Sequence, residues 1–362
     1  MQCGRLRKAV RPVVLSLYRQ PHPLPLSSSC LYRHASSSTK RAHWSRFNRG
    51  AILGSLGSVA GLATAFHCYT TSTVYCSHSA PTSSLPRLTL YEYPSCPFCG
   101  KVRAFCDYNN LDYTAVSVNP VSRKEIQFSK SKKLPLIVVD GEKIQDSSLV
   151  VSVLQTSMER GLSVAECLKF YPPVNVTTTE GENTTERGNK YFIMYGEESQ
   201  SRGLGQLSFL LVSREEREWR QWVDDELVHT LPPNIYRSLS EARQTMTAVS
   251  GKSSMTIFQR FVARNIGPVA LYYIGKRNIK KYNLKPDARE SLYDCCNQWV
   301  EAIGCDRQFM GGATPNLADL AVYGTLSATE GLATFTDIQT HTKIGPWYSA
   351  MREIVDTPPP MT

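Results

Sequence analysis

The chain has 362 residues, of which 41% are apolar and 10% aromatic, so it is long enough to form two hydrophobic cores. Its formal net charge of +10 is confined to one end, because residues 1–91 hold eleven Lys or Arg and no Asp or Glu, while the rest holds 30 basic and 31 acidic residues. This distribution excludes a generally basic, nucleic-acid-binding protein. The eleven cysteines are odd in number and irregularly spaced, which excludes a disulfide framework and predicts a reducing compartment.

Two targeting features precede the folded part. Residues 1–49 form a basic, Ser-rich arm that is typical of a mitochondrial-type targeting segment, with a disordered tail as the alternative. Residues 50–69, "GAILGSLGSVAGLATAFHCY", have bilayer length, no formal charge and a small-residue face. They predict a single membrane span, with a flexible linker as the alternative. Residues 70–86 predict a Ser/Pro linker.

The basic residues before the span would keep the N-terminus inside and place the folded domains outside. Free cysteines fare badly there, and cleavage of the arm would remove this conflict.

An alternation of strand and helix patterns fills residues 87–165. We expect strands over Leu88–Tyr93, Tyr113–Asn119 and Leu134–Asp140, and helices over Cys96–Tyr108 and Arg123–Lys130. The turn signal Asp140-Gly141 predicts a hairpin, and Asp146-Ser147 predicts a capped helix that ends at Gly161. The order indicates an α/β domain with a mixed sheet and right-handed crossovers.

The second half of the chain follows a different pattern. Residues Glu166–Gly188 are rich in Pro, Thr and Glu and predict a linker or an exposed excursion, followed by a short strand over Tyr191–Tyr195. Residues 166–212 are therefore assigned as a linker with a short strand. From 213 to 354 the apolar residues recur at helical spacing, which predicts an all-α domain.

The segment Cys96-Pro97-Phe98-Cys99 lies between an expected strand and an expected helix. A thiolate at a helix N-terminus is stabilised by unpaired N–H groups and by the helix dipole, so Cys96 is expected to be a nucleophile of low pKa, with Cys99 as the secondary thiol. No metal is expected, because zinc needs four ligands and no second Cys-x-x-Cys occurs. Two buried structural thiols remain the alternative. The motif in this position indicates a thioredoxin-like fold.

Two further positions point to a thiol peptide as ligand. In a thioredoxin-like fold Pro135 would be a cis-proline that faces the thiol, with Leu134 offering backbone hydrogen bonds to an extended peptide. Asp146 and Ser147 offer a carboxylate and helix N–H groups suited to the γ-glutamyl end of glutathione. Asp146 could equally be a plain helix cap, and both roles can hold at once.

These segments resemble two known domains. "YEYPSCPFCGKVRAF", "KLPLIVVD" and "QDSSLVVSVL" resemble a glutaredoxin-like domain, and "GGATPNLADLAVYG" resembles the core helix of the glutathione transferase C-terminal domain, with Asn316 as cap and Asp319 closing the capping box. With "WRQWVDDELVH" and the N-terminal span, residues Leu85–Ile354 resemble the membrane-associated prostaglandin E synthases of this two-domain type.

The resemblance implies an isomerase that converts prostaglandin H2 to prostaglandin E2, with Cys96 as the essential cysteine and Tyr93 and Phe98 beside it. It also implies glutathione contacts at Leu134, Asp146 and Ser147. Leu134 departs from the usual Val, but backbone contacts should survive that change. Haem bound through the glutathione thiolate is implied as well, in a form that cleaves the substrate to a C17 hydroxy acid and malondialdehyde.

The resemblance further implies a homodimer, and a single-pass association with the Golgi membrane with the folded domains in the cytosol and release to the cytoplasm. The mitochondrion is the alternative location. Two other functions stay open from the residues alone: a glutaredoxin-type thiol oxidoreductase that uses Cys96 and Cys99 together, and a non-catalytic module that binds haem or glutathione. It also stays open whether His229 or the basic cluster Arg277–Lys281 contacts a ligand.

Overall fold

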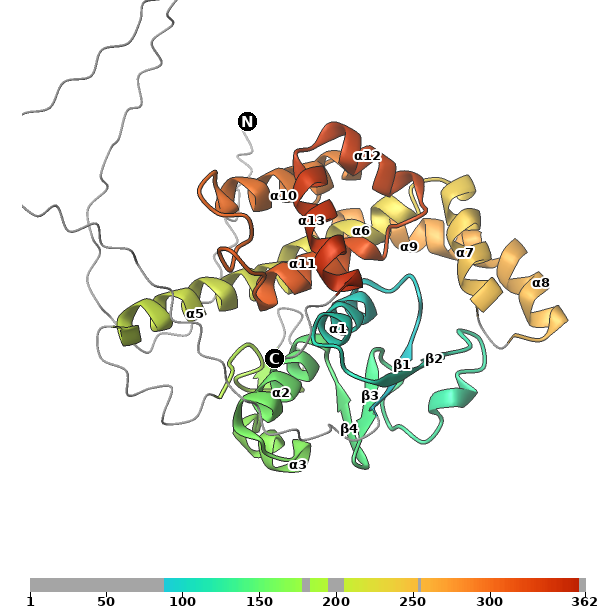
Figure 1. Ribbon diagram of the computed structural model, residues 1–362. Coiled ribbons are helices and arrows are strands. Elements are labelled where there is room, and N and C mark those ends of the chain that lie inside the picture. The colour runs from blue at the N-terminus through green and yellow to red at the C-terminus, as the bar shows by residue number, and fades with distance from the viewer. Residues whose placement is uncertain (1–87, 178–182, 195–204, 253–254, 358–362) are drawn as a thin grey trace, which may run out of the picture. The chain divides into compact units, whose positions relative to one another are not determined.

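The computed structural model describes residues 88–177, 183–194, 205–252 and 255–357 (Figure 1). The predicted arm, membrane span and linker therefore lie outside the described residues. Within the described ranges, none of the helices combines the length and the apolar character that crossing a membrane requires.

A four-stranded mixed sheet forms the first half of the described chain. It has the strand order β2-β1-β3-β4, in which β1 pairs in parallel with β2 and antiparallel with β3. The strands are β1 (Leu88–Glu92), β2 (Tyr113–Ser117), β3 (Leu136–Val139) and β4 (Glu142–Gln145). Helices α1 (Pro97–Tyr108) and α2 (Ser147–Arg160) pack against each other on one face of the sheet, and their apolar residues share one core with Leu88 and Leu90. This confirms the α/β prediction.

Local signals placed the ends of these elements correctly. Asp140 and Gly141 have φ angles of 52° and 81°, as a tight turn between β3 and β4 requires. Asp146 caps α2 by accepting N–H bonds from its first turn, and Gly161 ends the helix at a φ of 62°.

The helix expected over Arg123–Lys130 is wrong in extent. The structure has only a 3₁₀ turn, η1 (Lys124–Ile126). The Lys132 ammonium group donates to the carbonyl oxygens of Ile126, Gln127 and Ser129 at 2.7–3.1 Å. A side chain thus satisfies the carbonyl groups that a continuing helix would have used.

The excursion after residue 165 contains more regular structure than its composition indicates. A short helix, α3 (Val164–Cys167), and a 3₁₀ turn, η2 (Leu168–Phe170), lead into a hairpin of β5 (Pro173–Thr177) and β6 (Asn183–Arg187). The hairpin residues with a described exposure are mostly exposed to solvent. The composition of this segment indicates a linker, so it did not predict the pairing. β5 and β6 form a sheet of their own, separate from the four-stranded sheet.

The strand expected over Tyr191–Tyr195 is wrong for its described part, Tyr191–Met194, which is a turn followed by irregular chain. Its backbone groups pair locally or with side chains of neighbouring elements. The Tyr191 carbonyl accepts from Arg220 at 3.0 Å, and the Met194 N–H donates to Thr156 Oγ1 at 3.1 Å. These two bonds use backbone groups that a strand ladder would otherwise need.

The predicted all-α second half is confirmed. It runs from α5 (Gly205–Trp222) through a π-helical stretch, η3 (Val223–Leu227), directly into α6 (Val228–Ile235). The remaining helices are α7 (Leu239–Lys252), α8 (Ile257–Asn265), α9 (Gly267–Lys281), α10 (Ala288–Ile303), α11 (Leu317–Ser327), α12 (Ala333–His341) and α13 (Ile344–Asp356).

Helix α11 is the buried centre of the helical half, since ten of its eleven residues are buried. Asn316 caps it, and Asp319 closes the capping box as predicted. The Asp319 carboxylate also accepts from the N–H groups of Met310 and Gly311 and from the Trp347 indole at 2.9–3.2 Å. One buried side chain thus fixes the start of α11, the preceding loop and α13.

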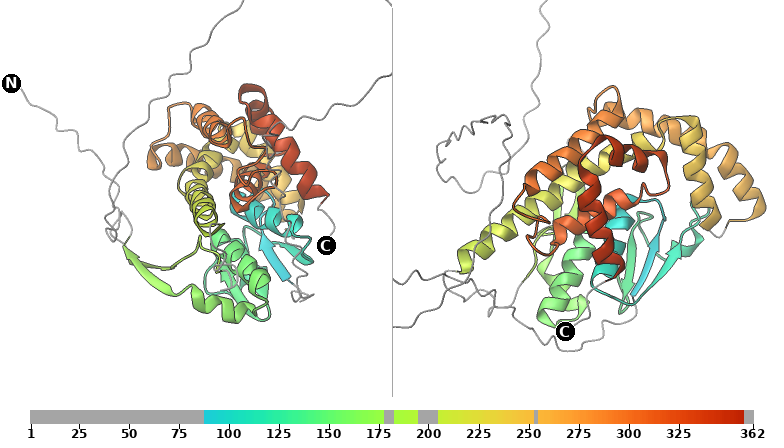
Figure 2. Two further views of the ribbon diagram at one scale, coloured as in Figure 1. Left: turned by 60° about the vertical axis from the view of Figure 1, so that its left-hand side comes forward. Right: turned by 45° about the horizontal axis from the view of Figure 1, so that its top comes forward.

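The two halves meet where α1 packs on α11, as Figures 1 and 2 show. Their backbones touch at Gly100 and Gly324, because a Cβ atom added to either glycine would overlap the carbonyl oxygen of the other. Beside this contact, the buried Lys101 ammonium pairs with Asp224 of η3 and donates to Ser148 of α2 at 2.9 Å. The ion pair links three elements from both halves.

Replacing Gly324 by Ala should therefore destabilise the protein. The added methyl group meets backbone rather than a flexible side chain, so the helices must separate, and overpacking of this kind costs roughly 1–3 kcal/mol. Gly345→Ala in α13 is the matched control, because a Cβ there meets nothing within 4 Å. Urea denaturation should show a lower midpoint for Gly324→Ala alone; equal midpoints for both variants would contradict the close contact.

Candidate functional site

The loop that joins β1 to α1 holds Cys96, the predicted nucleophile. The Cys96 N–H donates to the Tyr93 carbonyl at 3.0 Å, which turns the chain, and Cys96 then occupies the N-cap position of α1 with Pro97 in its first turn. Proline suits this position because its missing N–H would have no helical partner. Cys96 is partly exposed, whereas Cys99, one turn further, is fully buried.

The surroundings of Cys96 lower its pKa. The largest cause is the Cys99 thiol, which donates a hydrogen bond to the Cys96 sulfur. Burial acts in the opposite direction, and the backbone N–H groups of Cys99 and Phe98 and the charge of Arg103 add further stabilisation of the thiolate. The predicted low-pKa nucleophile at a helix N-terminus is thus supported by named donors.

Cys99 has the opposite character. Burial raises its pKa well above the ordinary value, and the negative Cys96 sulfur adds to that effect. Cys99 therefore stays protonated and remains a hydrogen-bond donor to Cys96. The Tyr93 backbone N–H in turn bonds the Cys99 sulfur, so the three residues form a chain of donors that ends at the nucleophile.

Tyr93 lies on the opposite face of the sheet from α1 and α2. It packs with Leu134 against a small core made by Val118, Ile126 and Leu136. Burial raises the pKa of the Tyr93 hydroxyl, and the Arg123 guanidinium opposes that rise. Because the pKa remains above its ordinary value, the hydroxyl stays neutral near pH 7 and is able to donate a proton in a hydrogen bond.

A cavity of about 680 Å³ opens beside this loop and is lined by five of the residues predicted from the sequence. These are Phe98, Leu134, Pro135, Asp146 and Ser147. The Leu134–Pro135 peptide is cis, as predicted. Cys96, Tyr93 and Cys99 are not among the lining residues; Cys96 lies next to the cavity through Phe98, two residues along the first turn of α1.

Most of the charged groups of this cavity were missed by the sequence analysis. They are Lys133 before β3, Glu186 and Arg187 of β6, Lys190 in the turn after β6, and Asp224 and Asp225 of η3. The uncharged Gln145 of β4 and Tyr191 also line the cavity. The π-helical stretch inserts an extra residue into the α5–α6 helix at Asp224-Asp225. The acidic pair in "WVDDELVH" is visible in the sequence. Whether its side chains face the cavity depends on the π-helical irregularity.

Asp146 is both a helix cap and a cavity residue. Its carboxylate accepts from the Ser148 and Leu149 N–H groups at 3.0 and 3.4 Å, and its second oxygen accepts from the Lys190 ammonium group at 3.3 Å. Burial lowers the pKa of Lys190, but the carboxylates of Asp146 and Glu186 more than offset this, so the net shift is upward. Asp146 also has a φ of 74°. Non-glycine residues rarely adopt that value, and such strain clusters at functional sites.

A second cavity of about 330 Å³ adjoins the first, because Asp225 lines both. His229 lies in it and stacks on Tyr282 with ring centroids 3.7 Å apart. Burial lowers the pKa of His229. The basic residues Arg277, Lys280 and Lys281 are exposed and line neither of these two cavities in the described part of the chain.

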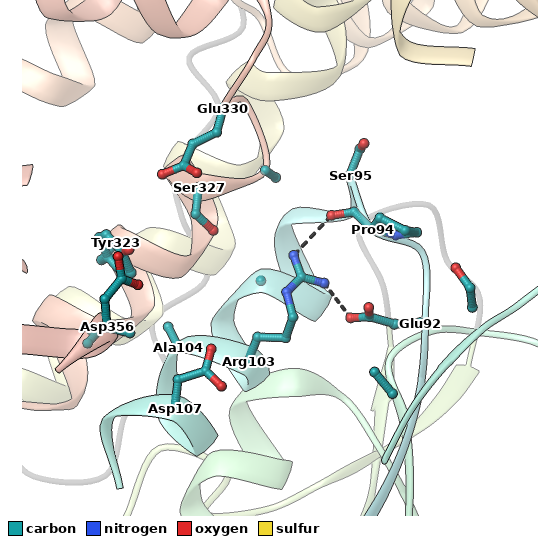
Figure 3. A pocket seen from close by; sticks show the side chains of 15 residues that line it. Glu92, Pro94, Ser95, Arg103, Ala104, Asp107, Tyr323, Ser327, Glu330 and Asp356 are labelled. Carbon is teal, nitrogen blue, oxygen red and sulfur yellow. Dashed lines mark hydrogen bonds and ion pairs between the residues drawn. The ribbon is translucent and has the colours of Figure 1, made fainter. Parts of the chain in front are cut away.

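A third cavity, of about 620 Å³, lies behind the reactive loop (Figure 3). Arg103 crosses it to bond the Pro94 carbonyl at 2.9 Å and to pair with the Glu92 carboxylate (Figure 3). Its guanidinium therefore connects the end of β1 to the loop before Cys96.

Comparisons with known proteins match these features. The family "Glutathione S-transferase, N-terminal domain" matches residues 90–159. The chain is 41% identical to mouse prostaglandin E synthase 2 over 77% of its length and 73% of the relative's, and 42% identical to the zebrafish (Danio rerio) prostaglandin E synthase 2 over 74% and 71%.

Solved structures of glutathione transferases are similar at lower identity. Glutathione transferase F7 from Populus trichocarpa is 11% identical to this chain, with a TM-score of 0.42. The match covers 76% of this chain and 95% of that protein. A Ceriporiopsis subvermispora glutathione S-transferase in complex with glutathione is 15% identical with a TM-score of 0.37, covering 75% and 99%.

The donor role of Cys99 predicts a difference between two substitutions. Cys99→Ala removes the largest stabilising contact of the Cys96 thiolate, so the pKa of Cys96 should rise, whereas Cys99→Ser keeps a donor and should shift it less. The pH dependence of iodoacetamide alkylation at Cys96, followed by peptide mass spectrometry, measures this. The alkylation curve of Cys99→Ala should move to higher pH; coincident curves for the two variants would show that the thiol donor has no such role.

Proposed function

The chain belongs to the prostaglandin E synthase 2 family and is an enzyme of that kind, and on this premise we propose that it isomerises prostaglandin H2 to prostaglandin E2 with Cys96 as the reacting group. The observation that carries the assignment is Cys96 itself, a partly exposed residue whose thiol pKa is lowered by donors from Cys99 and Phe98. A stabilised thiolate is the nucleophile that this chemistry needs.

The reaction breaks an O–O bond and removes one C–H proton without net oxidation. The Cys96 thiolate attacks one peroxide oxygen, so that an S–O bond forms and the other oxygen leaves as an alkoxide. The carbon that bears the S–O group then loses its proton, its electron pair forms the carbonyl, and the S–O bond breaks to return the thiolate. The alkoxide takes up one proton, so the numbers of protons and electrons balance.

Tyr93 and Phe98 have supporting roles in this proposal. The neutral Tyr93 hydroxyl donates a hydrogen bond to the sulfur or to the developing alkoxide, where a preorganised donor has its largest effect. Phe98 lines the 680 Å³ cavity and supplies apolar wall for a lipid substrate. Cys99 is not consumed in the reaction and acts only through its hydrogen bond.

We further propose that the 680 Å³ cavity binds glutathione. The backbone of Leu134 beside Pro135 suits an extended peptide, and Asp146 and Ser147 stand at the N-terminus of α2. The Asp146 carboxylate is a partner for the γ-glutamyl ammonium group. Lys133, Arg187 and Lys190 line the same cavity and are suited to the peptide's carboxylates.

The residues present also fit haem held through the glutathione thiolate. No His, Cys or Met side chain lines the 680 Å³ cavity among the described residues, and the hydroxyl of Tyr191, which does line it, donates to Asp224. The thiolate of glutathione would therefore be the iron ligand. The cations of the cavity would hold the haem carboxylates. With haem bound, the site would cleave the substrate to the C17 hydroxy acid and malondialdehyde in place of isomerisation.

The same proposal includes a homodimer and attachment to the Golgi membrane through residues 50–69, with the folded domains in the cytosol. We also propose that the α/β domain spans residues 87–165 and the helical domain residues 213–354.

The thiol roles are tested by incubating the full chain with prostaglandin H2, with and without glutathione and haem, and resolving the products by mass spectrometry. Prostaglandin E2 should form in the haem-free protein, fall to the spontaneous background in Cys96→Ser, and persist in Cys99→Ser. Loss of activity in Cys99→Ser would instead favour a glutaredoxin-type dithiol enzyme. If the wild type formed prostaglandin E2 only at the spontaneous background level, the protein would bind haem and glutathione without isomerase activity.

The glutathione site is tested with Asp146→Asn. Asparagine is a good N-cap, so the helix should persist, but the charge-assisted contact to the ligand is lost, and glutathione should bind roughly tenfold more weakly. Asp140→Asn in the β3–β4 turn is the matched control, because asparagine also tolerates its φ of 52°. Isothermal titration calorimetry measures both; equal affinities would refute a ligand role for Asp146.

A further inference from the structure

Helices α8 and α9 expose an unusual number of large apolar side chains. Seven of the twelve large apolar residues that are most exposed in the described part of the chain lie on these two helices. They are Ile257, Phe258, Phe261, Ile266, Val269, Tyr273 and Ile274, and together they define the α8–α9 face. Ile257 is 89% and Phe258 75% exposed.

This arrangement reverses the usual orientation of an amphipathic helix. Ala263 is the one buried residue of α8, whereas the larger Ile257, Phe258 and Phe261 are exposed. Thr256 and Gln259 form a capping box that fixes the start of the helix without any contribution from apolar burial. Several exposed large apolar side chains on two helices that contact each other indicate a surface that another body covers.

The charge of the same region selects the kind of partner. Residues 242–286 contain nine Lys or Arg and no Asp or Glu. Without them, residues 92–362 hold 21 basic against 31 acidic side chains, so the positive charge of the folded part is concentrated here. The nine are Arg243, Lys252, Arg260, Arg264, Lys276, Arg277, Lys280, Lys281 and Lys285.

A second copy of the chain fits this charge poorly, because a symmetric contact would bring two identical basic surfaces together. An acidic bilayer surface fits well. Basic amphipathic helices with Phe, Tyr and Ile on their apolar side lie in the plane of the membrane interface, where lysines and arginines meet anionic headgroups.

We propose that the α8–α9 face binds the surface of an anionic phospholipid bilayer, with its apolar side chains in the headgroup region and the basic residues around them at the phosphates. Figures 1 and 2 show α8 at the edge of the helical half, where no other described helix covers its outer side. This contact is independent of residues 50–69 and of the reaction itself.

The position of the face relative to the reactive loop adds a consequence that rests on the proposed function. Asn119 Nδ2 donates to Gln259 Oε1 of α8 at 3.0 Å, and its Oδ1 accepts from the Val121 and Ser122 N–H groups. The same loop carries Arg123, which lies beside Tyr93. A bilayer on the α8–α9 face would therefore place a membrane-dissolved substrate near the loop that leads to Cys96.

The binding is tested in the full chain by a local probe, so that attachment through other segments does not interfere. Phe261→Trp is mixed with phosphatidylcholine vesicles that contain phosphatidylserine and lipids brominated in their acyl chains. The added indole emission should be quenched, because bromine in the acyl chains reaches only inserted groups. Val174→Trp on the β5 strand is the matched control: it is also an exposed apolar position and should not be quenched.

A charge-reversed pair, Arg264→Glu with Lys276→Glu, is added to the Phe261→Trp background. Each basic residue near an anionic surface contributes roughly a fivefold preference for the bound state, so the quenching should fall at least several-fold. Quenching of Phe261→Trp no stronger than that of Val174→Trp would overturn the proposal. A lipid-free blue shift that grows with protein concentration would also overturn it, in favour of a second copy. Neither result depends on prostaglandin turnover, which is assayed separately.

Discussion

The position of the reactive thiol depends on the contact between α1 and α11. Cys96 is the N-cap of α1, Gly100 is the fourth residue of the helix, and that glycine touches the backbone of Gly324 in the buried centre of the helical half. Lys101, the next residue, is fixed by Asp224 from η3. The first turn of α1 is thus held in place from the helical half, while Arg103 holds the preceding loop from the sheet side. In the proposed reaction, a thiol placed this firmly needs little reorganisation before it attacks.

The Lys101–Asp224 ion pair gives the two acidic residues of the π-helical stretch, Asp224 and Asp225, different environments. Asp224 receives bonds from Lys101, Ser148 and Tyr191, and the Lys101 charge keeps its pKa low despite burial. Asp225 is exposed and lies between the two adjoining cavities. In a regular α-helix these two carboxylates would point in other directions. The π-helical irregularity therefore determines which residues of the helical half line the cavity that opens in the α/β half.

Local patterns of the sequence were sufficient for the parts of the fold that local chemistry determines. The Cys96 helix start, the Asp140-Gly141 turn, the Asp146 cap and the Asn316 capping box each depend on a few neighbouring residues, and all four are present. The missed parts depend on distant partners. Tyr191 is not in a strand, and its carbonyl oxygen accepts instead from Arg220 of α5. The hairpin that supplies Arg187 lies within a segment whose composition indicates a loop. The predicted ligand residues lie in one cavity because the fold brings them together. The charged residues that line the same cavity could not be predicted from spacing in the sequence.

Net charge gave a misleading impression of the folded part for a similar reason. With 30 basic and 31 acidic side chains beyond residue 91, the composition indicates a nearly neutral surface. The average conceals a segment of 45 residues, 242–286, with nine cations and no carboxylate, set against an acidic remainder. Electrostatic attraction to a membrane falls off within about 10 Å at physiological ionic strength, so a local cluster attracts an anionic surface even when the domain as a whole is neutral. The apolar side chains of α8 and α9 lie inside that cluster, and it is the coincidence of the two, rather than either alone, that distinguishes a membrane-facing surface from a solvated basic one.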